Sequence, residues 1–465
     1  MKLKVLFLIF FVFVFLTEAF SQRFHCPLGR FYDLDMQQLT LKDSVEKFSL
    51  VKPVLFPENK IDTIYKEKFF SWLDTHFFED DFLKFASKKY SLTINPILDL
   101  ELYYQKDLED GKKYFLNTRG FEAFGRLGKR IFFKTEFYEN QSRFLPFRAF
   151  VIKSRNSIVP SCGYAKPFET DGLDYAVSIS SISFDVNRNF KLSFGNDRNF
   201  IGSGYRSVIL SDLTFPYPYL RMDFNYKKFY YYALGSYLHD GLFSYYNYLI
   251  TDYKYAVYHI LGYKPLKNLE IALVESNIWC KNDNSFALGY DINYGLFDRI
   301  KFYTQGNYQG KHVDINSEEK QLFSVNCGVH FFDFLSFLVD GLNSHAQFEY
   351  TVSRYDKNNS KVSFWSYCYP LTTPFVMDKN SGAEAVCFVD FEYKRAAVDV
   401  KYLTRNSSCY KDLTLRYFLN KKTKWNLFVC FSSHNCSKEY YSKDWDYKYI
   451  TAGISITPAN SYFDF

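Results

Sequence analysis

Apolar and polar residues alternate with a period of two along most of the chain. The first such segment interleaves two rows of residues, Leu98, Leu100, Leu102 and Tyr104 with Asp99, Glu101, Tyr103 and Gln105. The same alternation recurs around residues 220–227, 300–309, 396–402 and 413–419. Successive side chains of a strand point to opposite faces, so each segment predicts a β-strand with one apolar and one polar face.

The number and length of these segments favour a membrane barrel over a soluble sandwich. Roughly eighteen segments of about nine to twelve residues follow residue 91, long enough to cross a bilayer at a tilt, whereas soluble strands average about five or six residues. The pattern therefore predicts an all-β fold, a large antiparallel transmembrane outer-membrane β-barrel over residues 92–465. We expect about 18 strands, with 16 as the alternative, and an even number would put both chain ends in the periplasm.

The chain before the barrel divides into two predicted parts. In residues 1–21, Lys2 and Lys4 precede an apolar run that ends at Leu16, and small residues follow, which is typical of a cleavable secretory signal peptide. Residues 22–91 show apolar side chains at helical spacings and predict a short N-terminal helical plug or periplasmic segment. The residues that carry this spacing are Ile64, Tyr65, Phe69, Trp72, Leu73, Phe78, Phe82 and Phe85.

Composition supports the barrel and narrows the partners. Aromatic residues make up 21% of the sequence and charged residues 23%, as aromatic girdles around a polar lumen require. An AT-rich genome would also enrich Phe and Tyr, so the alternation carries more weight. The formal charge of +6 is spread along the chain, which argues against nucleic acid as a partner. The expected partners are outer-membrane lipid and, from the terminal aromatic Phe465, the barrel-insertion machinery.

The nine cysteines give no reason to expect a metal or another cofactor, because they form no CxxC pair and no zinc-like spacing. Cys387 and Cys430 fall within predicted strands. The surroundings of four others look loop-like: Cys162, Cys368, Cys409 and Cys436. The longer loop-like stretches are predicted at residues 142–170, 196–218, 356–385 and 432–444, either at the outer face or folded into the lumen.

One stretch, between Phe194 and Leu220, combines glycines with polar and aromatic residues. Its candidate site residues are Gly195, Asp197, Gly202, Gly204, Tyr205, Arg206, Ser207, Ser211 and Asp212, followed by Phe215-Pro216-Tyr217-Pro218-Tyr219. The stretch resembles the signature of the Wzi-like capsule-assembly family, most closely its RemB-like branch from Bacteroidetes. Segments 70–79, 94–97, 117–121 and 462–465 are similar to that family as well.

The resemblance implies an eighteen-stranded outer-membrane barrel plugged by N-terminal helices. It also implies a non-enzymatic role at the cell surface, in capsule or exopolysaccharide assembly and surface attachment or in gliding-related adhesion, with surface polysaccharide as the partner. The residues themselves allow two roles for the motif. Arg206 and Asp212 could hold a loop inside the barrel, for example through an ion pair, or the motif could contact glycan, with Tyr205, Phe215, Tyr217 and Tyr219 as stacking faces. The first role is favoured.

Enzymatic function is not expected. The eight histidines form no HExxH motif and the sequence has no nucleophile elbow, so no catalytic residue is assigned. A phosphate-binding glycine loop would need a third glycine and a strand–helix context, which Gly202 and Gly204 lack. The alternative function is a diffusion or uptake porin, which would have an open lumen. A third, an outer-membrane lipase or protease, would need a nucleophile and a base at one rim.

Overall fold

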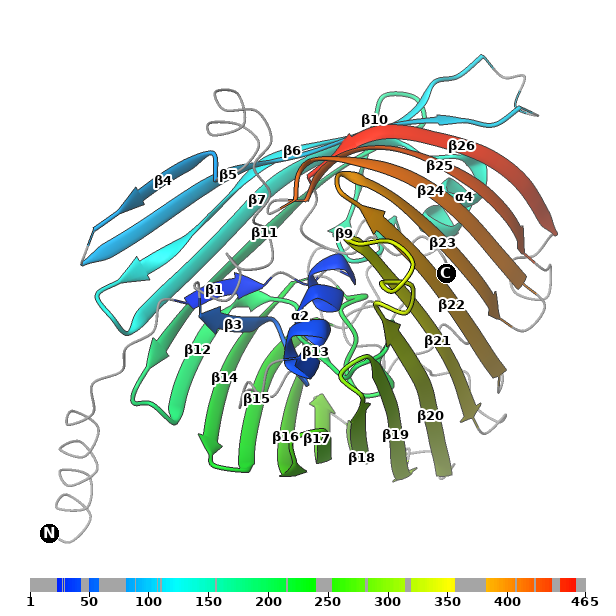
Figure 1. Ribbon diagram of the computed structural model, residues 1–465. Helices are drawn as coiled ribbons and strands as arrows, with labels where there is room; N and C mark the ends of the chain where they lie inside the picture. Colours follow the sequence, from blue (N-terminus) through cyan, green and yellow to red (C-terminus); the bar gives the residue numbers. More distant parts are fainter. Residues whose placement is uncertain are drawn as a thin grey trace, which may run out of the picture.

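A computed structural model describes residues 23–26, 28, 30–42, 50–57, 81–87, 89–106, 108, 111–154, 157–214, 216–239, 253–280, 283–313, 319–355, 382–405, 408–421, 424–436 and 444–456. Figure 1 shows one large ring of strands with a helix inside its outline. The predicted signal peptide, residues 58–80 of the predicted helical segment, Cys368 and the chain terminus after residue 456 lie outside the described residues.

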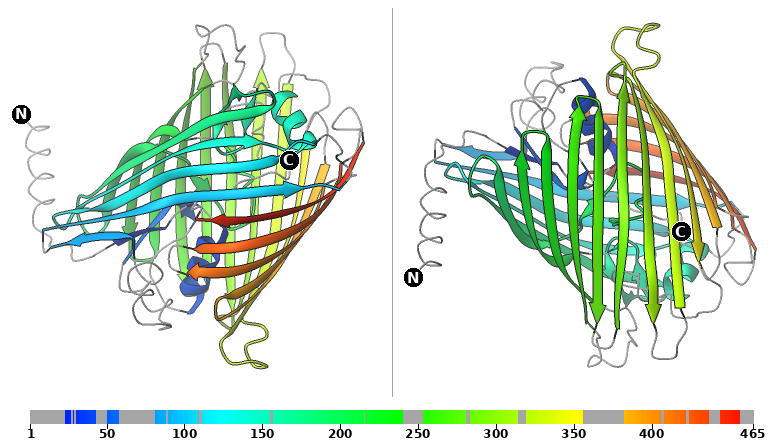
Figure 2. Two further views of the ribbon diagram at one scale, coloured as in Figure 1. Left: turned by 90° about the horizontal axis from the view of Figure 1, so that it is seen from above. Right: turned by 90° about the horizontal axis from the view of Figure 1, so that it is seen from below.

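Eighteen antiparallel strands close into a barrel, which confirms the predicted fold and strand number. Each strand pairs with the next one along the chain, and β26 pairs with β5 to close the ring. The barrel strands are β5 (Tyr90–Tyr104), β6 (Tyr114–Leu127), β7 (Ile131–Arg143), β11 (Gly172–Asp185), β12 (Phe190–Asp197), β14 (Tyr217–Tyr226), β15 (Phe229–His239), β16 (Tyr253–Leu266), β17 (Leu269–Cys280), β18 (Asp283–Leu296), β19 (Ile300–Val313), β20 (Glu319–Phe332), β21 (Leu342–Tyr355), β22 (Gly382–Tyr393), β23 (Ala396–Arg405), β24 (Ser408–Asn420), β25 (Trp425–Cys436) and β26 (Trp445–Ser455). In Figure 2 the blue-to-cyan strands cross the green and yellow strands of the opposite wall obliquely, as strands of a tilted barrel do.

The burial of side chains is the reverse of that in a soluble protein. On β14, the predicted apolar row of Leu220, Met222 and Phe224 is exposed on the outer surface, while Arg221 and Asp223 of the polar row are buried inside. The other strands follow the same rule, with outward apolar rows such as Leu413, Leu415 and Tyr417 on β24. Exposed apolar rows need lipid around them, and inward polar rows need partners in the lumen.

The two ends of the barrel differ in their connections. At one end β5 begins, β26 ends, and the connections are mostly tight turns such as residues 227–228, 267–268 and 394–395. We call this the short-turn end. The opposite end, the long-connection end, carries residues 144–171 and 198–216. In outer-membrane barrels, short turns face the periplasm and longer loops face outward.

The remaining elements lie at or inside the barrel. They are helices α2 (Arg30–Lys42) and α4 (Pro146–Ser154) and strands β1 (Arg23–Cys26), β2 (Val51–Lys52), β3 (Val54–Pro57), β4 (Leu83–Ala86), β8 (Ile158–Val159), β9 (Gly163–Tyr164), β10 (Lys166–Phe168) and β13 (Phe200–Ile201). No helix in the described part of the chain is long and apolar enough to span a membrane.

Helix α2 occupies the lumen near the short-turn end (Figure 1). Asp33 lies in its first turn, where a negative charge favours the helix dipole, and accepts a hydrogen bond from Gln37 one turn later. Two residues at connections of the short-turn end hold the helix. Lys424 donates to Asp35, and Asp333 accepts from the side chain of Gln38. A helix therefore lies within the predicted N-terminal segment and contacts the inside of the barrel.

Three local predictions are wrong. Phe85, expected on a helix, lies on strand β4, which pairs with the first residues of β5. Cys409 and Cys436, expected in loops, lie on β24 and β25, as do residues 432–436 of a predicted loop. Residues 382–385, also predicted as loop, begin β22. Cys387 and Cys430 lie on strands as predicted.

Candidate functional site

The motif forms a loop that turns into the barrel. We call residues 198–216, between β12 and β14, the lumenal loop. Its short strand β13 pairs with β2 of the N-terminal segment, and Ile201 also bridges to Leu210, so the loop folds back on itself. Ile201, Val208, Ile209 and Leu210 belong to a buried apolar cluster with lumen-facing residues of β14 to β18. The loop is thus a packed element of the interior.

Two amides of β19 hold the backbone of the lumenal loop. The Gln305 side chain donates to the Ile201 carbonyl (2.8 Å) and accepts from the Val208 amide (2.9 Å). The Asn307 side chain donates to the Val208 carbonyl (3.1 Å). At Gly202, φ is +145°, and a Cβ atom would stand 2.7 Å from the Gln305 amide nitrogen. Only glycine fits this backbone conformation so close to Gln305.

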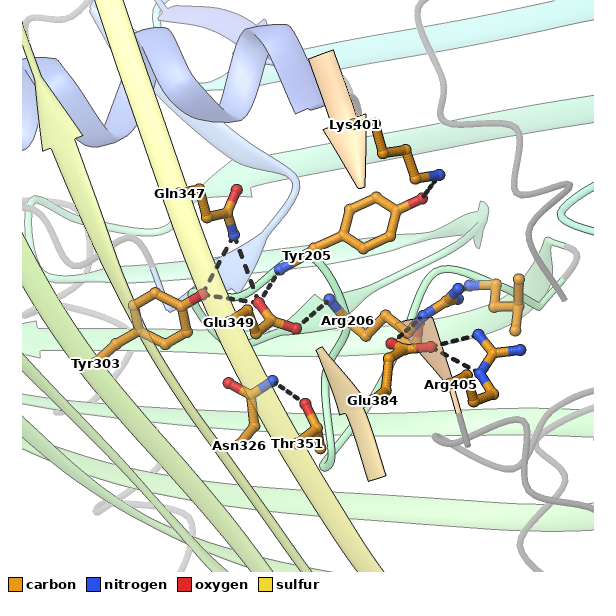
Figure 3. A network of polar contacts seen from close by, with 12 residues as sticks. Tyr205, Arg206, Tyr303, Asn326, Gln347, Glu349, Thr351, Glu384, Lys401 and Arg405 are labelled. Carbon is orange, nitrogen blue, oxygen red and sulfur yellow. Dashed lines mark hydrogen bonds and ion pairs between the residues drawn. The ribbon is translucent and has the colours of Figure 1, made fainter. Parts of the chain in front are cut away.

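The carboxylate of Glu349, on β21, receives the next part of the loop (Figure 3). Its Oε2 accepts hydrogen bonds from the Tyr205 amide (2.6 Å) and from the Tyr303 hydroxyl (2.7 Å), and Oε1 accepts from the Arg206 amide (3.4 Å). A Cβ at Gly204 would lie 2.5 Å from Glu349 Oε2. The second glycine of the motif therefore lets the chain approach a buried carboxylate.

Arg206 reaches the opposite wall of the barrel. Its Nε donates to Glu384 Oε1 of β22 (2.8 Å), and Arg405 of β23 donates to Glu384 Oε2 from its Nε (2.8 Å) and its terminal nitrogen (Figure 3). β22 lies nine strands from β12 in the ring of eighteen, half-way round. Arg206 thus forms an ion pair with Glu384, and this contact spans the lumen.

Tyr205 is the motif residue with the most accessible ring among those brought to the interior. It packs edge-on against Phe388 at 4.9 Å between ring centroids. Lys401 Nζ lies over the Tyr205 ring and donates to its hydroxyl (3.2 Å). Of the other predicted stacking faces, Tyr217 and Tyr219 are buried, and Phe215 lies outside the described residues.

The other motif residues shape the two ends of the loop. Gly195 lies within β12, where a Cβ would be 2.4 Å from the Ser180 carbonyl oxygen. The Asp197 side chain accepts from the Arg198 amide (2.7 Å). Ser207 Oγ accepts from the Leu210 amide (3.0 Å), Ser211 Oγ accepts from the Leu213 amide (3.3 Å), and the Asp212 carbonyl accepts from Ser161 Oγ (3.4 Å). Each of these residues therefore contacts atoms of the lumenal loop or of a neighbouring segment.

The first residues of the lumenal loop also contact the segment after α4. Arg198 is buried and donates to the Ser161 carbonyl (3.2 Å). Burial alone would lower the pKa of the Arg198 guanidinium, but Tyr138, Asp197 and Asp212 outweigh it and raise that pKa. Burial raises the pKa of the neighbouring Cys162 thiol to about 11, so this cysteine stays protonated. In the described part of the chain, no group of three His, Cys, Asp or Glu side chains is placed to hold a metal.

Helix α2, which we call the plug helix, contacts both the barrel wall and the lumenal loop. Arg30 forms a two-pronged ion pair with Asp390 of β22 and lies over the Phe388 ring at 3.9 Å. Burial tends to lower the pKa of Arg30, but the charge of Asp390 outweighs burial and raises that pKa. The guanidinium therefore stays charged. The Gln37 amide donates to the Ser203 carbonyl (3.4 Å), which ties α2 to the lumenal loop.

The sequence did not single out the partners that hold the motif, Gln305, Glu349, Glu384 and Asp390. They belong to the inward polar rows of β19, β21 and β22, and alternation could mark them only as lumen-facing. Nothing in the local pattern separates them from the many other inward polar residues.

Comparison with known proteins supports the architecture. No protein-family model and no curated protein sequence matches the chain. Among solved structures, the chain is similar to Wzi of Escherichia coli, described as an outer-membrane protein involved in group 1 capsule assembly and a carbohydrate-binding β-barrel. That match covers 93% of this chain and 99% of Wzi, with 12% identity and a TM-score of 0.53. OccAB4 of Acinetobacter baumannii matches at 10% identity over 79% of this chain and 97% of its own, with a TM-score of 0.46. The chain thus has a Wzi-like barrel fold.

Proposed function

We propose that the protein is a non-enzymatic barrel of the bacterial outer membrane that binds surface polysaccharide, such as capsule or exopolysaccharide, and retains it at the cell surface. The observation that carries this proposal is the Arg206–Glu384 contact across the lumen. A chain that crosses its own barrel, with amides and carboxylates of the far wall bound to it, fits a surface-binding protein better than a diffusion channel.

Two further observations support the proposal. The fold is similar to that of E. coli Wzi, whose description includes carbohydrate binding and capsule assembly. At the lumenal loop, the Tyr205 ring lies beside Lys401 and Phe388, which places an apolar face next to a polar donor where a sugar ring could stack. We also propose a RemB-like branch of the family, with gliding-related adhesion as its use, on the strength of the motif between Gly195 and Asp212.

The proposed location follows from the same features. Residues 1–21 would export the chain as a cleaved signal peptide, the insertion machinery would recognise the aromatic terminus, and the outward apolar rows would contact lipid. The short-turn end would face the periplasm, and the long-connection end, with α4, would face outward.

The test uses the full-length mature barrel in detergent micelles and in planar bilayers. Purified surface polysaccharide of the producing bacterium should be retained by immobilised wild-type barrel, and a Tyr205→Ala variant should retain less. Tyr231→Ala, at an outward-facing ring on β15, is the matched control and should bind like wild type. Bilayer conductance of the wild type should be low. No polysaccharide retention together with a stable open-channel conductance would favour the porin alternative and overturn the proposal.

A further inference from the structure

Two buried histidines connect the lumenal loop to the plug helix in a continuous row. His330 Nε2 lies 3.3 Å from the Ser203 carbonyl oxygen of the loop, and His330 Nδ1 lies 3.0 Å from His345 Nε2. His345 Nδ1 lies 2.9 Å from Asp390 Oδ2, and Asp390 also holds Arg30 of α2. Both rings are more than nine-tenths buried. The row therefore runs from loop to plug through three nitrogen contacts.

Counting protons shows that two neutral histidines cannot satisfy this row. Each of the three contacts needs one N–H, because both end atoms, the Ser203 carbonyl and the Asp390 carboxylate, only accept hydrogen bonds. A neutral imidazole carries one N–H, so the pair supplies two. Arg30 donates to both oxygens of Asp390, which keeps the carboxylate ionised and leaves the imidazoles as the place for a third proton.

We propose that His330 and His345 form a proton-binding site that holds one proton more than two neutral imidazoles, and that this proton fastens the lumenal loop to the barrel wall. With the proton bound, His345 donates to Asp390, His330 donates to His345 through Nδ1, and His330 Nε2–H donates to Ser203. When the proton leaves, the longest contact is lost first. The lone pair of His330 Nε2 then faces the Ser203 carbonyl, and the two acceptors repel each other.

Charged groups from several elements face the pair: the cations oppose an added proton, and the carboxylates favour it. Arg30 and Asp33 come from α2, Lys301 and Tyr303 from β19, and Asp390 from β22. Lys301 Nζ donates to Ser203 Oγ (3.3 Å) and to the side-chain oxygen Oε1 of Gln37 (3.4 Å). The loop therefore keeps a second attachment at Ser203 when the histidine proton leaves. Proton release should loosen the lumenal loop without unfolding the barrel.

Hydrogen–deuterium exchange of the full barrel in micelles tests the proposal. Histidine changes charge between about pH 5 and 8, so peptides covering residues 200–210 are compared across that range after correction for intrinsic amide exchange. In the wild type, protection of this segment should fall about five-fold or more as pH rises, the loss expected for one hydrogen bond. Protection of peptides from the barrel strands that do not contact the lumenal loop should not change with pH.

Variants separate the site from general effects of pH. In His330→Gln, a side-chain amide donates to Ser203 at every pH, so the loop should stay protected throughout. In His330→Phe, the donor is gone and protection should be low throughout. His434→Gln, at a histidine bonded to Asp412 away from the row, should behave like wild type. A wild-type loop with constant protection, or a His330→Gln loop that keeps the full pH dependence, would overturn the proposal. Neither readout involves polysaccharide, so the result is independent of the proposed function.

Discussion

The lumenal loop and plug helix α2 both fill the barrel, yet different forces hold them. The loop is bound by buried side-chain amides and carboxylates, and the side chains of its ion pair with Glu384 are 3% and 1% exposed. α2 is bound by ion pairs that lie nearer to solvent, since the side chains of Arg30 and Asp390 are 13% and 12% exposed and those of Lys424 and Asp35 are 11% and 26% exposed. Pairs nearer to solvent contribute less and are screened more by salt than fully buried pairs. The helix should therefore detach more readily than the loop.

The largest effect is expected where the loop meets the far wall. Glu384→Ala leaves the buried guanidinium groups of Arg206 and Arg405 without their shared carboxylate, which should reduce the free energy of unfolding by about 3–5 kcal/mol. Urea unfolding in lipid vesicles measures the change. Glu392→Ala is the control, since it removes a half-buried pair with Lys421 from the same strand and should cost about 1 kcal/mol or less. Equal losses in the two variants would contradict the difference between buried and exposed pairs.

A smaller effect is expected from the amide that holds the loop backbone. Gln305→Ala removes the partner of the Ile201 carbonyl and the Val208 amide and should cost about 1–3 kcal/mol in the same unfolding assay. Exchange of residues 200–210 should rise, while exchange of residues 30–42 stays unchanged. Thr304→Ala, one residue away on the outward face, provides the control. A uniform rise over both segments would show that the loop and the helix open together.

The helix should respond to salt where the loop does not. Raising the salt concentration to about 1 M shortens the screening length to about 3 Å, so exchange of residues 30–42 should increase several-fold and exchange of residues 200–210 should not. Arg30→Ala should raise helix exchange already at low salt, because Asp390 loses its two-pronged partner. Salt-insensitive exchange of α2 would mean that apolar packing, and not charge, holds it.

The smallest effect on stability is expected at the short-turn end. Lys424→Ala removes the pair with Asp35 and should lower the free energy of unfolding by about 1 kcal/mol or less. Its effect should vanish at high salt, and it should leave exchange of the lumenal loop unchanged. A loss as large as that of Glu384→Ala would show that this pair is stronger than its exposure suggests.

The barrel could be predicted from the sequence because the alternation of apolar and polar residues is local and repeats in every strand. Rows such as Leu220, Met222 and Phe224 opposite Arg221 and Asp223 define two faces with no knowledge of the tertiary structure. The sequence singled out the motif, which lies in a largely buried loop inside the barrel, and its role there stays a prediction. The partner of Arg206 was not found, because Glu384 is 178 residues away and a lumen of eighteen strands offers many acids.

The wrong local predictions have two physical causes. Phe82 and Phe85 are three residues apart, as on a helix, but a short apolar segment fits either a helix or a strand, and pairing with β5 decided for the strand. Cys409 and Cys436 lie at the ends of β24 and β25, where strands end by the geometry of the ring and not by a change in composition.

The contact between Arg206 and Glu384 has a mechanical consequence. The wall of a wide barrel is a single layer of strands, and lateral pressure from the membrane could deform its round cross-section into an oval. A covalent segment anchored at β12 and β14 and bound half-way round at β22 acts as a cross-brace along one diameter. We therefore expect the shape of the cross-section to depend on this contact inside the molecule as well as on the surrounding lipid.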